Sequence, residues 1–419
     1  TNNIFVRWLT TQAINVPADS SVTTPKIVDS AVTTAKIADQ NVTTQKVADN
    51  AITTAKIAAG AVIPLDLANG GAELGMRNRI INGAMVIDQR NAGASVTYSS
   101  NPGYPVDRNR FEFSQVSKIT GQRSTTAPTG FTNSAQGTVA AAVTPGAADY
   151  FLIGQAIEGL NVADLGWGTA SAQTVTLSFW VRSSITGTYS LRFTNGSFNR
   201  TYLTPYTISA ANTWEQKTIT LVGDTSGTWA TDNSAGIVVQ WDLGAGSNAT
   251  SSTTNTWQAG NYQHVTGSVN WISTAGATFY ITGVQLERGS TATPFEYRPY
   301  GTELALCQRY YEKSYNQSNA PGVATSSGAS QSVASTNFIL ANGTVNMKVA
   351  KRASPTVLVY SISSGTSGVV AEYNASGVFV ADRSFVSAAT GESSFWIQVA
   401  GTATVGNDIR FQWTATAEL

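Results

Sequence analysis

Residues 174–182 read TVTLSFWVR, where apolar and polar residues alternate and β-branched or aromatic types dominate. This alternation predicts a β-strand that is buried on one face. Further runs of the same kind lie on either side, separated by Gly, Asn and Ser: 188–194, 214–222, 236–243 and 277–287. Many short strands joined by such turns predict an antiparallel β-sandwich or jelly roll, so the fold class is mostly β. We place this domain at residues 71–300.

Composition excludes several classes of function. Charged residues make up 12% of the 419 residues and the formal net charge is zero, so no long-range attraction to nucleic acid is expected. One cysteine and one histidine cannot form an intramolecular disulfide or a His-rich metal site. We therefore expect no cofactor and assign no metal site, and the composition leaves a structural calcium open. No run of about 18 apolar residues occurs, so no membrane span is expected either.

The chain beyond the sandwich has its own pattern. Residues 304–313 read LALCQRYYEK, and the helical spacing of Leu304, Cys307 and Tyr311 predicts a helix. We expect this helix and the Ser- and Gly-rich residues after it to form a joint and linker over 301–335. Strand-like runs then predict a smaller C-terminal β-domain over 336–419: 337–340, 345–349, 356–362, 368–373, 394–399 and 408–414.

A ten-residue repeat precedes the sandwich, in the segment 21–70. Its copies read SVTTPKIVDS, AVTTAKIADQ, NVTTQKVADN and AITTAKIAAG, and a degenerate fifth copy ends at Gly70. The period suits neither a continuous helix nor a continuous strand. We expect each copy to combine an extended stretch with one helical turn that is capped by a threonine.

The repeat has too few apolar residues to bury a core within one chain. Either several chains pool their aliphatic side chains along one axis, or the segment is a disordered linker. The strict register favours pooling, because a linker needs no register. The residues expected to be pooled are Val22, Ile27, Val32, Ile37, Val42, Val47, Ile52 and Ile57.

The first twenty residues form a candidate docking peptide. Ile4, Phe5, Trp8 and Leu9 make a short apolar run with little charge. We expect this run to bind another protein, and the alternative is a strand that joins the protein's own body.

Aromatic and amide residues gather in two segments that could bind sugars. Sugar rings stack on aromatic side chains, and sugar hydroxyls hydrogen bond with Asn, Gln and Asp. The candidates are Trp229, Asp232, Asn233, Gln240, Trp241, Trp257 and Tyr262. The alternative for each tryptophan is a place in the sandwich core, where we also place Trp180 and Trp214.

Asp224, Asp232 and Asp242 lie close enough in sequence to raise a second alternative, the carboxylate pair of a glycosidase. The chain lacks the repeated β-helix rungs of enzymatic tailspikes. We therefore expect no enzymatic activity.

Four stretches carry a resemblance to a known family. The xVTTxKIADx repeat resembles the shaft of tailed-bacteriophage tail fibres. RNRIINGAMVIDQRNAG (77–93) and ITGVQLERGSTATPFEYRPYGTELALCQRYYEK (281–313) resemble the beginning and end of a body domain in tail-fibre proteins. MKVAKRASPTV (347–357) resembles the start of a C-terminal β-domain found behind that body.

This resemblance implies an elongated homotrimer in the virion, with three chains sharing the shaft. It implies a body like a carbohydrate-binding module, and a tail fibre that is assembled in the host cytoplasm and acts outside the cell. The implied partners are tail adaptor or tube proteins at residues 1–20 and bacterial surface polysaccharide or lipopolysaccharide. The family implies no catalytic residues. A capsid (head) fibre and a surface-polysaccharide depolymerase are the alternatives.

Overall fold

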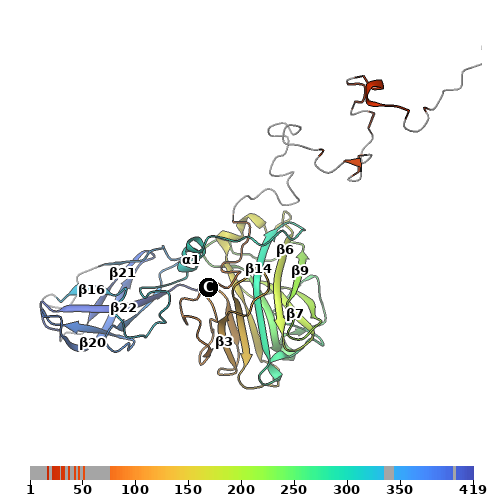
Figure 1. The fold of residues 1–419 in the computed structure, drawn as a ribbon. Helices are drawn as coiled ribbons and strands as arrows, with labels where there is room; N and C mark the ends of the chain where they lie inside the picture. The colour runs from red at the N-terminus through yellow and green to blue at the C-terminus, as the bar shows by residue number, and fades with distance from the viewer. Residues whose placement is uncertain are drawn as a thin grey trace, which may run out of the picture. The chain divides into compact units, whose positions relative to one another are not determined.

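The computed structural model of the chain describes residues 76–334, 344–399 and 403–419, together with short stretches between residues 17 and 51 (Figure 1). The chain divides into two units, Thr1–Asp66 and Leu67–Leu419, which are considered separately. The predicted strand at 337–340, the docking residues Ile4, Phe5, Trp8 and Leu9, and the shaft residues Ile52 and Ile57 lie outside the described residues. Among the described helices, none has the length and apolar character needed to cross a membrane.

Residues 96–288 form a β-sandwich of two six-stranded sheets. The β14 sheet contains, in spatial order, β1 (Val96–Thr97), β3 (Ile119–Ser124), β4 (Ser134–Val139), β14 (Thr278–Arg288), β6 (Val175–Ser183) and β9 (Glu215–Leu221). The β10 sheet contains β12 (Trp257–Ala259), β8 (Arg200–Ile208), β7 (Gly187–Asn195), β10 (Ala235–Ala245), β5 (Tyr150–Glu158) and β2 (Arg110–Phe113). All pairings within both sheets are antiparallel, which confirms the predicted antiparallel sandwich.

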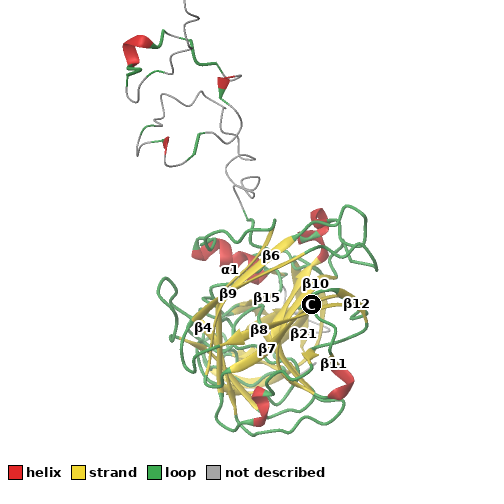
Figure 2. Cartoon of the chain, turned by 90° about the vertical axis from the view of Figure 1, so that its right-hand side faces the viewer, coloured by secondary structure: helices red, strands yellow, loops and turns green. Residues whose placement is uncertain are grey.

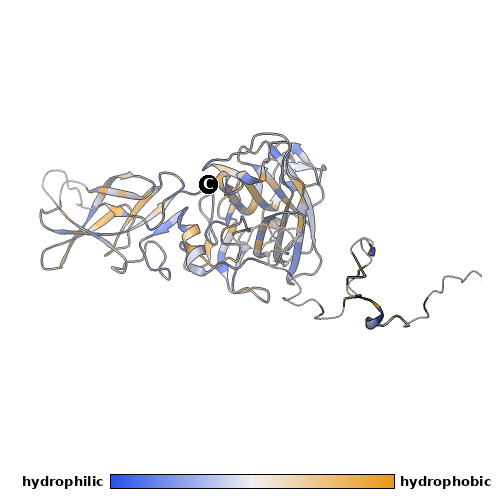
Figure 3. Cartoon of the chain, turned by 90° about the horizontal axis from the view of Figure 1, so that it is seen from above, coloured by the Kyte–Doolittle hydropathy of each residue, from blue (hydrophilic) through white to orange (hydrophobic). Residues whose placement is uncertain are grey.

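The core of the sandwich lies between the two sheets. Alternate residues of each strand point into it, so Val239 and Trp241 of β10 are buried together with Phe179 of β6. The same alternation turns Gln240 to the outer face of the β10 sheet. The strands are drawn yellow in Figure 2, and Figure 3 shows hydrophobic segments along them.

Five strands of the sandwich match the sequence prediction closely, and others were not predicted. The strand β8 carries Pro205 at its middle, which argues against a strand because proline cannot donate to a sheet. Ser190 of β7 stands opposite Pro205 on one side, but on the other side β12 pairs with β8 only from Arg200 to Tyr202, so no strand needs a donor from Pro205 on that side. The nearly continuous apolar strand β5 shows no alternation because its outer face is also covered.

The C-terminal part is a second, antiparallel sheet with its own core. A helix, α1 (Tyr300–Gln308), ends earlier than the predicted 304–313, and Tyr311 belongs to a strand. Two strands also lie in the segment predicted as joint and linker. The sheet contains β15 (Tyr311–Lys313), β16 (Ser330–Val333), β17 (Val345–Asn346), β18 (Thr356–Ser361), β19 (Val369–Tyr373), β20 (Phe379–Thr390), β21 (Ser394–Val399) and β22 (Asp408–Thr416).

Residues around α1 connect this sheet to the sandwich. Cys307 is fully buried beside Ile81 and Tyr310, and burial raises the pKa of its thiol well above the usual value. Arg309 forms an ion pair with Glu158 of the sandwich. Cys307 is therefore a packing residue, as its helical position predicts.

The described parts of the repeat share one local structure. The amides of Lys26, Lys36 and Lys46 each donate to the carbonyl three residues earlier, and residues Thr24–Lys26 form a short 3-10 helix, η1. The predicted helical turn is thus present in each of these copies. The aliphatic side chains of the same copies lie open to solvent within the single chain: Val22, Ile27, Val32, Ile37 and Val42 are 41–57% exposed, while Val47 is half-buried.

Candidate functional site

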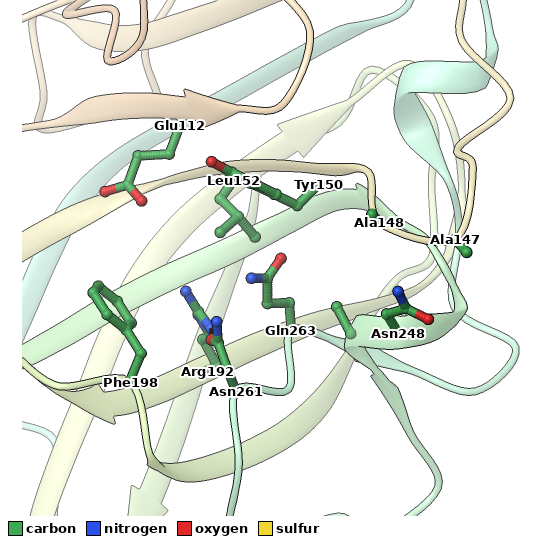
Figure 4. Close-up of a pocket in the computed structure, with 11 residues that line it drawn as sticks. Glu112, Ala147, Ala148, Tyr150, Leu152, Arg192, Phe198, Asn248, Asn261 and Gln263 are labelled. Carbon is green, nitrogen blue, oxygen red and sulfur yellow. Dashed lines mark hydrogen bonds between the residues drawn. The ribbon is translucent and has the colours of Figure 1, made fainter.

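A cavity of about 400 Å³ lies on the outer face of the β10 sheet (Figure 4). This volume falls in the range of small-molecule binding sites. We call it the β10-sheet cavity. Its lining residues are Glu112, Ala147, Ala148, Tyr150, Leu152, Arg192, Phe198, Asn248, Ala249, Asn261 and Gln263.

The register of the sheet places the polar floor of this cavity. Gln240 of β10 stands opposite Arg192 of β7 on one side and Gly154 of β5 on the other. The Arg192 Nε atom donates to Gln240 Oε1 at 2.8 Å. A Cβ atom at Gly154 would lie 2.6 Å from Gln240 Cγ, so glycine is needed there for close packing. Leu152 of β5 and Glu112 of β2 stand opposite each other in the same sheet, and both line the cavity.

Three loops wall the cavity and hold one another by backbone hydrogen bonds. Asn248 belongs to a short 3-10 helix, η7 (Ser247–Ala249). Its backbone amide donates to Ala147 O at 2.9 Å. The Gln263 amide donates to Ala249 O at 2.8 Å. Asp149 receives bonds from Ser114, Gly146 and Gln115, and these bonds lower the pKa of its carboxyl. The rim is therefore tied to the sheet at several points.

Of the two aromatic residues that line the cavity, Tyr150 belongs to β5 and Phe198 to the turn between β7 and β8. Phe198 has φ +54°, a left-handed conformation that side chains of its size rarely adopt. The Asn195 side chain fixes this turn, because its Oδ1 accepts from the Asn199 amide at 3.1 Å and its Nδ2 donates to Thr228 O at 3.0 Å. The Phe198 ring centroid consequently lies 5.5 Å from Arg192 Cζ, within the range of a cation–π contact.

A buried histidine–aspartate pair supports the same face. His264 of β13 (His264–Val265) lies with Nδ1 2.6 Å from Asp242 Oδ2, and Val265 donates its amide to Ser190 Oγ at 2.8 Å. Burial lowers the pKa of His264, but the adjacent carboxylate outweighs burial and raises that pKa above 6.5. Burial raises the pKa of Asp242, and His264 limits the rise. The pair anchors the segment that carries Gln263.

The predicted tryptophans do not line this cavity. Trp241 is 1% exposed and lies in the sandwich core, where its ring is 5.2 Å from that of Phe179. Trp229 and Trp257 pack edge to face, at 5.2 Å, in a cluster that also contains Trp167. Trp229 and Trp241 are therefore packing residues, because their apolar area is buried, whereas Trp257 is half-buried.

Trp180 and Trp214, which we expected in the core, are only half-buried. Phe179 and Val181 occupy the core on either side of Trp180, so strand alternation turns Trp180 to the outer face of the β14 sheet. That prediction was wrong.

The other predicted sugar contacts are scattered. Gln240 is buried beneath Arg192 and accepts from its Nε atom, and the Tyr262 carbonyl accepts from Arg192 Nη1 at 3.4 Å, but neither residue lines the cavity. Asp232 and Asn233 are exposed in a turn away from the cavity, where Asn233 Nδ2 donates to Arg352 O at 2.6 Å. The structure thus brings together Gln240 and Tyr262 only.

The three aspartates considered as a glycosidase pair each have a separate structural partner. Asp224 accepts two bonds from Arg200, at 2.7 and 2.8 Å. Asp232 caps its own turn through Ser234, which lowers the pKa of its carboxyl. Asp242 is paired with His264. Among the described residues, no three His, Cys, Asp or Glu side chains gather as a metal site requires.

Sequence reasoning missed Arg192, Phe198, Gln263 and Glu112. Arg192 occupies a polar position in the alternating run TYSLRFT, where it resembles any solvent-facing strand residue. The turn after it could be recognised from Asn195 and Gly196. Nothing local indicates that loops more than forty residues away in sequence close over this position.

No family model matches the chain, and no curated protein is similar to it in sequence. One similar solved structure is the enzymatically active domain of tailspike protein 4 from bacteriophage CBA120, with a TM-score of 0.26, 13% identity and 51% of this chain covered. The chain spans 21% of that protein.

A family 11 carbohydrate-binding module from Clostridium thermocellum, in complex with a β-1,3-1,4-mixed-linked tetrasaccharide, has a TM-score of 0.25 and 11% identity over 48% of this chain and 98% of its own. TmCBM61, in complex with β-1,4-galactotriose, has a TM-score of 0.23 and 11% identity over 46% of this chain and 99% of its own. At these TM-scores the similarity does not assign the chain to either group.

Proposed function

We propose that this chain is a structural, receptor-binding fibre protein that binds bacterial surface glycans in the β10-sheet cavity. The observation that carries this proposal is the composition of the cavity. It combines the Phe198 ring with the side-chain amides of Asn248, Asn261 and Gln263 over an apolar patch at Leu152. Aromatic faces suit the C–H faces of sugar rings, and amides suit their hydroxyls, which can both donate and accept.

Binding without cleavage fits the cavity better than hydrolysis. Glycoside hydrolysis by the usual mechanisms needs two carboxyl groups across the scissile bond. Glu112 is the one carboxylate among the lining residues, and it is already bonded to Arg110 Nε at 2.6 Å. We therefore propose that the protein is not an enzyme. Release of new reducing ends from a bound polysaccharide would contradict this part of the proposal.

The setting of this activity, we infer, is the tail of a bacteriophage. The repeat supports a trimeric shaft, since Val22, Ile27 and Val32 lie exposed in one chain and would be covered in a bundle. The resemblance to tail fibres supports attachment of residues 1–20 to tail adaptor or tube proteins. Three copies on one shaft would strengthen weak contacts to polysaccharide or lipopolysaccharide by avidity.

Binding of the full chain to purified surface polysaccharides tests the proposal. Ala148 is exposed at the cavity wall, so Ala148→Trp fills the cavity without disturbing the core. Thr144→Trp is the matched control, because Thr144 is exposed in the same loop but is not a lining residue. We expect Ala148→Trp to abolish binding and Thr144→Trp to leave it intact. Equal binding by both variants would exclude the cavity as the glycan site.

A further inference from the structure

Arg192 is a buried cation at the cavity. It is 2% exposed, and all of its hydrogen-bond partners are neutral. Nε donates to Gln240, and Nη1 donates to Asn261 Oδ1 and to the Tyr262 carbonyl. Nη2 donates to no residue that the structure describes, although the side chain lines the cavity. The Nη2 amino group of the guanidinium is therefore left to donate to a ligand.

The two carboxylates whose charges act on Arg192, Glu112 and Asp242, are engaged by other side chains. Glu112 is bonded to Arg110, and Asp242 is bonded to His264. No carboxylate oxygen of the described residues lies within the 4.0 Å of the guanidinium nitrogens that would make an ion pair. Burial lowers the pKa of Arg192 to about 10, with partial compensation from Glu112 and Asp242, so the group stays charged at neutral pH. Buried charges are normally paired.

An acceptor beside this cation is also unsatisfied. Gln263 is 6% exposed, and its Oε1 atom has no hydrogen-bond partner among the described residues. Figure 4 shows Arg192 and Gln263 on the same side of the cavity, facing Leu152 and Glu112. The cavity is therefore lined by a charged donor and a neutral amide side chain.

We propose that the β10-sheet cavity selects acidic glycans, whose sugar carboxylate binds Arg192 Nη2 beside the side-chain amide of Gln263. The proposal rests on the glycan-binding function proposed above. A carboxylate forms a charge-assisted hydrogen bond and supplies the missing counter-ion, whereas a neutral sugar leaves the buried charge unpaired. Uronic acids, and other sugars that carry a carboxylate, belong to this class.

A matched pair of ligands tests the proposal on the unmodified protein. We would measure the affinity of the full chain by calorimetry for oligogalacturonate, oligomannuronate and hyaluronate oligosaccharides. Each is compared with its methyl ester, which keeps the shape of the sugar and removes the charge. For the tightest acid, we expect esterification to weaken binding about tenfold or more, and added salt to weaken the acid but not the ester.

Two variants connect this difference to one residue. Arg192→Gln should bind acid and ester equally, and Arg192→Lys, which keeps the charge, should retain part of the preference. Circular dichroism and urea unfolding check that each variant is folded. The comparison of acid with ester in the unmodified protein needs no variant, so a misfolded variant does not remove the test.

The two proposals fail in different ways. If neutral oligosaccharides or esters bind as tightly as acids, and Ala148→Trp blocks them, acid selection is refuted and glycan binding in the cavity stands. If no glycan of the panel binds, neutral or acidic, the proposed function is refuted and acid selection with it.

Discussion

Replacing Phe198 by asparagine separates the ring's role in binding from its role in folding. The left-handed backbone at φ +54° costs a bulky residue about 1–2 kcal/mol, and asparagine tolerates this region. Loss of a half-buried ring costs about 1 kcal/mol of hydrophobic burial. The two effects nearly cancel, so we expect the free energy of unfolding to change by less than about 1 kcal/mol. Glycan affinity should fall about tenfold, since the sugar loses its stacking surface.

Two further variants at the same position make the comparison specific. Phe198→Tyr keeps the ring and should keep the affinity. Phe198→Ala removes the ring but keeps most of the strain, so it should be less stable than Phe198→Asn by about 1 kcal/mol. Urea unfolding and calorimetric titration on the same samples supply both quantities. If Phe198→Asn lowers stability by more than about 2 kcal/mol while affinity is unchanged, the ring is a packing residue and the reasoning is refuted.

Three other predictions test the surrounding structure. Lys351→Met leaves the buried Glu312 carboxylate unpaired and should lower the free energy of unfolding by about 3–5 kcal/mol, whereas Lys351→Met with Glu312→Leu should recover most of this loss in urea denaturation. Because its pKa is raised above 6.5 in the folded state, His264 should stabilise the protein fully below pH 6.5 and less as pH rises through the folded pKa. The stability difference between the natural protein and His264→Gln should therefore shrink as pH rises above 6.5, and a constant difference would contradict the Asp242 pairing. Trp229→Ala should lower the melting temperature through a loss of about 3 kcal/mol or more without weakening glycan binding by the folded protein, and a selective loss of affinity would restore its predicted sugar contact.

Local pattern was sufficient to predict the sandwich but not all of its strands. Alternation identified β6, β7, β9, β10 and β14, because one face of each is buried and the other is polar. In the C-terminal sheet the long strand β20 was also missed, since its polar residues and flanking turns interrupt any regular alternation. Whether a face of a strand is buried depends on the elements that pack against it, and the local sequence does not contain this information.

The candidate site depended still more on tertiary structure. The sequence contains ten tryptophans, and counting aromatic residues favoured segments rich in them. The structure buries Trp229 and Trp241, and the rings that line the cavity belong to Tyr150 and to Phe198 in a short turn. A large ring is most often buried because it contributes the most hydrophobic area, so aromatic content alone favours core positions over binding positions. Gln240 was predicted because it lies among tryptophan, amide and carboxylate side chains in the segment 223–243.

The structure of the full chain in complex with an oligosaccharide from a bound surface polysaccharide tests the central claim most directly. Electron cryo-microscopy of this complex would show the sugar and the number of chains together. We predict sugar density between Phe198, Arg192 and Gln263 in each of three chains of 44.0 kDa, with the repeats in contact along one axis. Sugar bound elsewhere, such as the second cavity beside Asn316, Lys348 and Trp413, would contradict the assignment of the binding site. A single chain with its repeats apart would contradict the fibre.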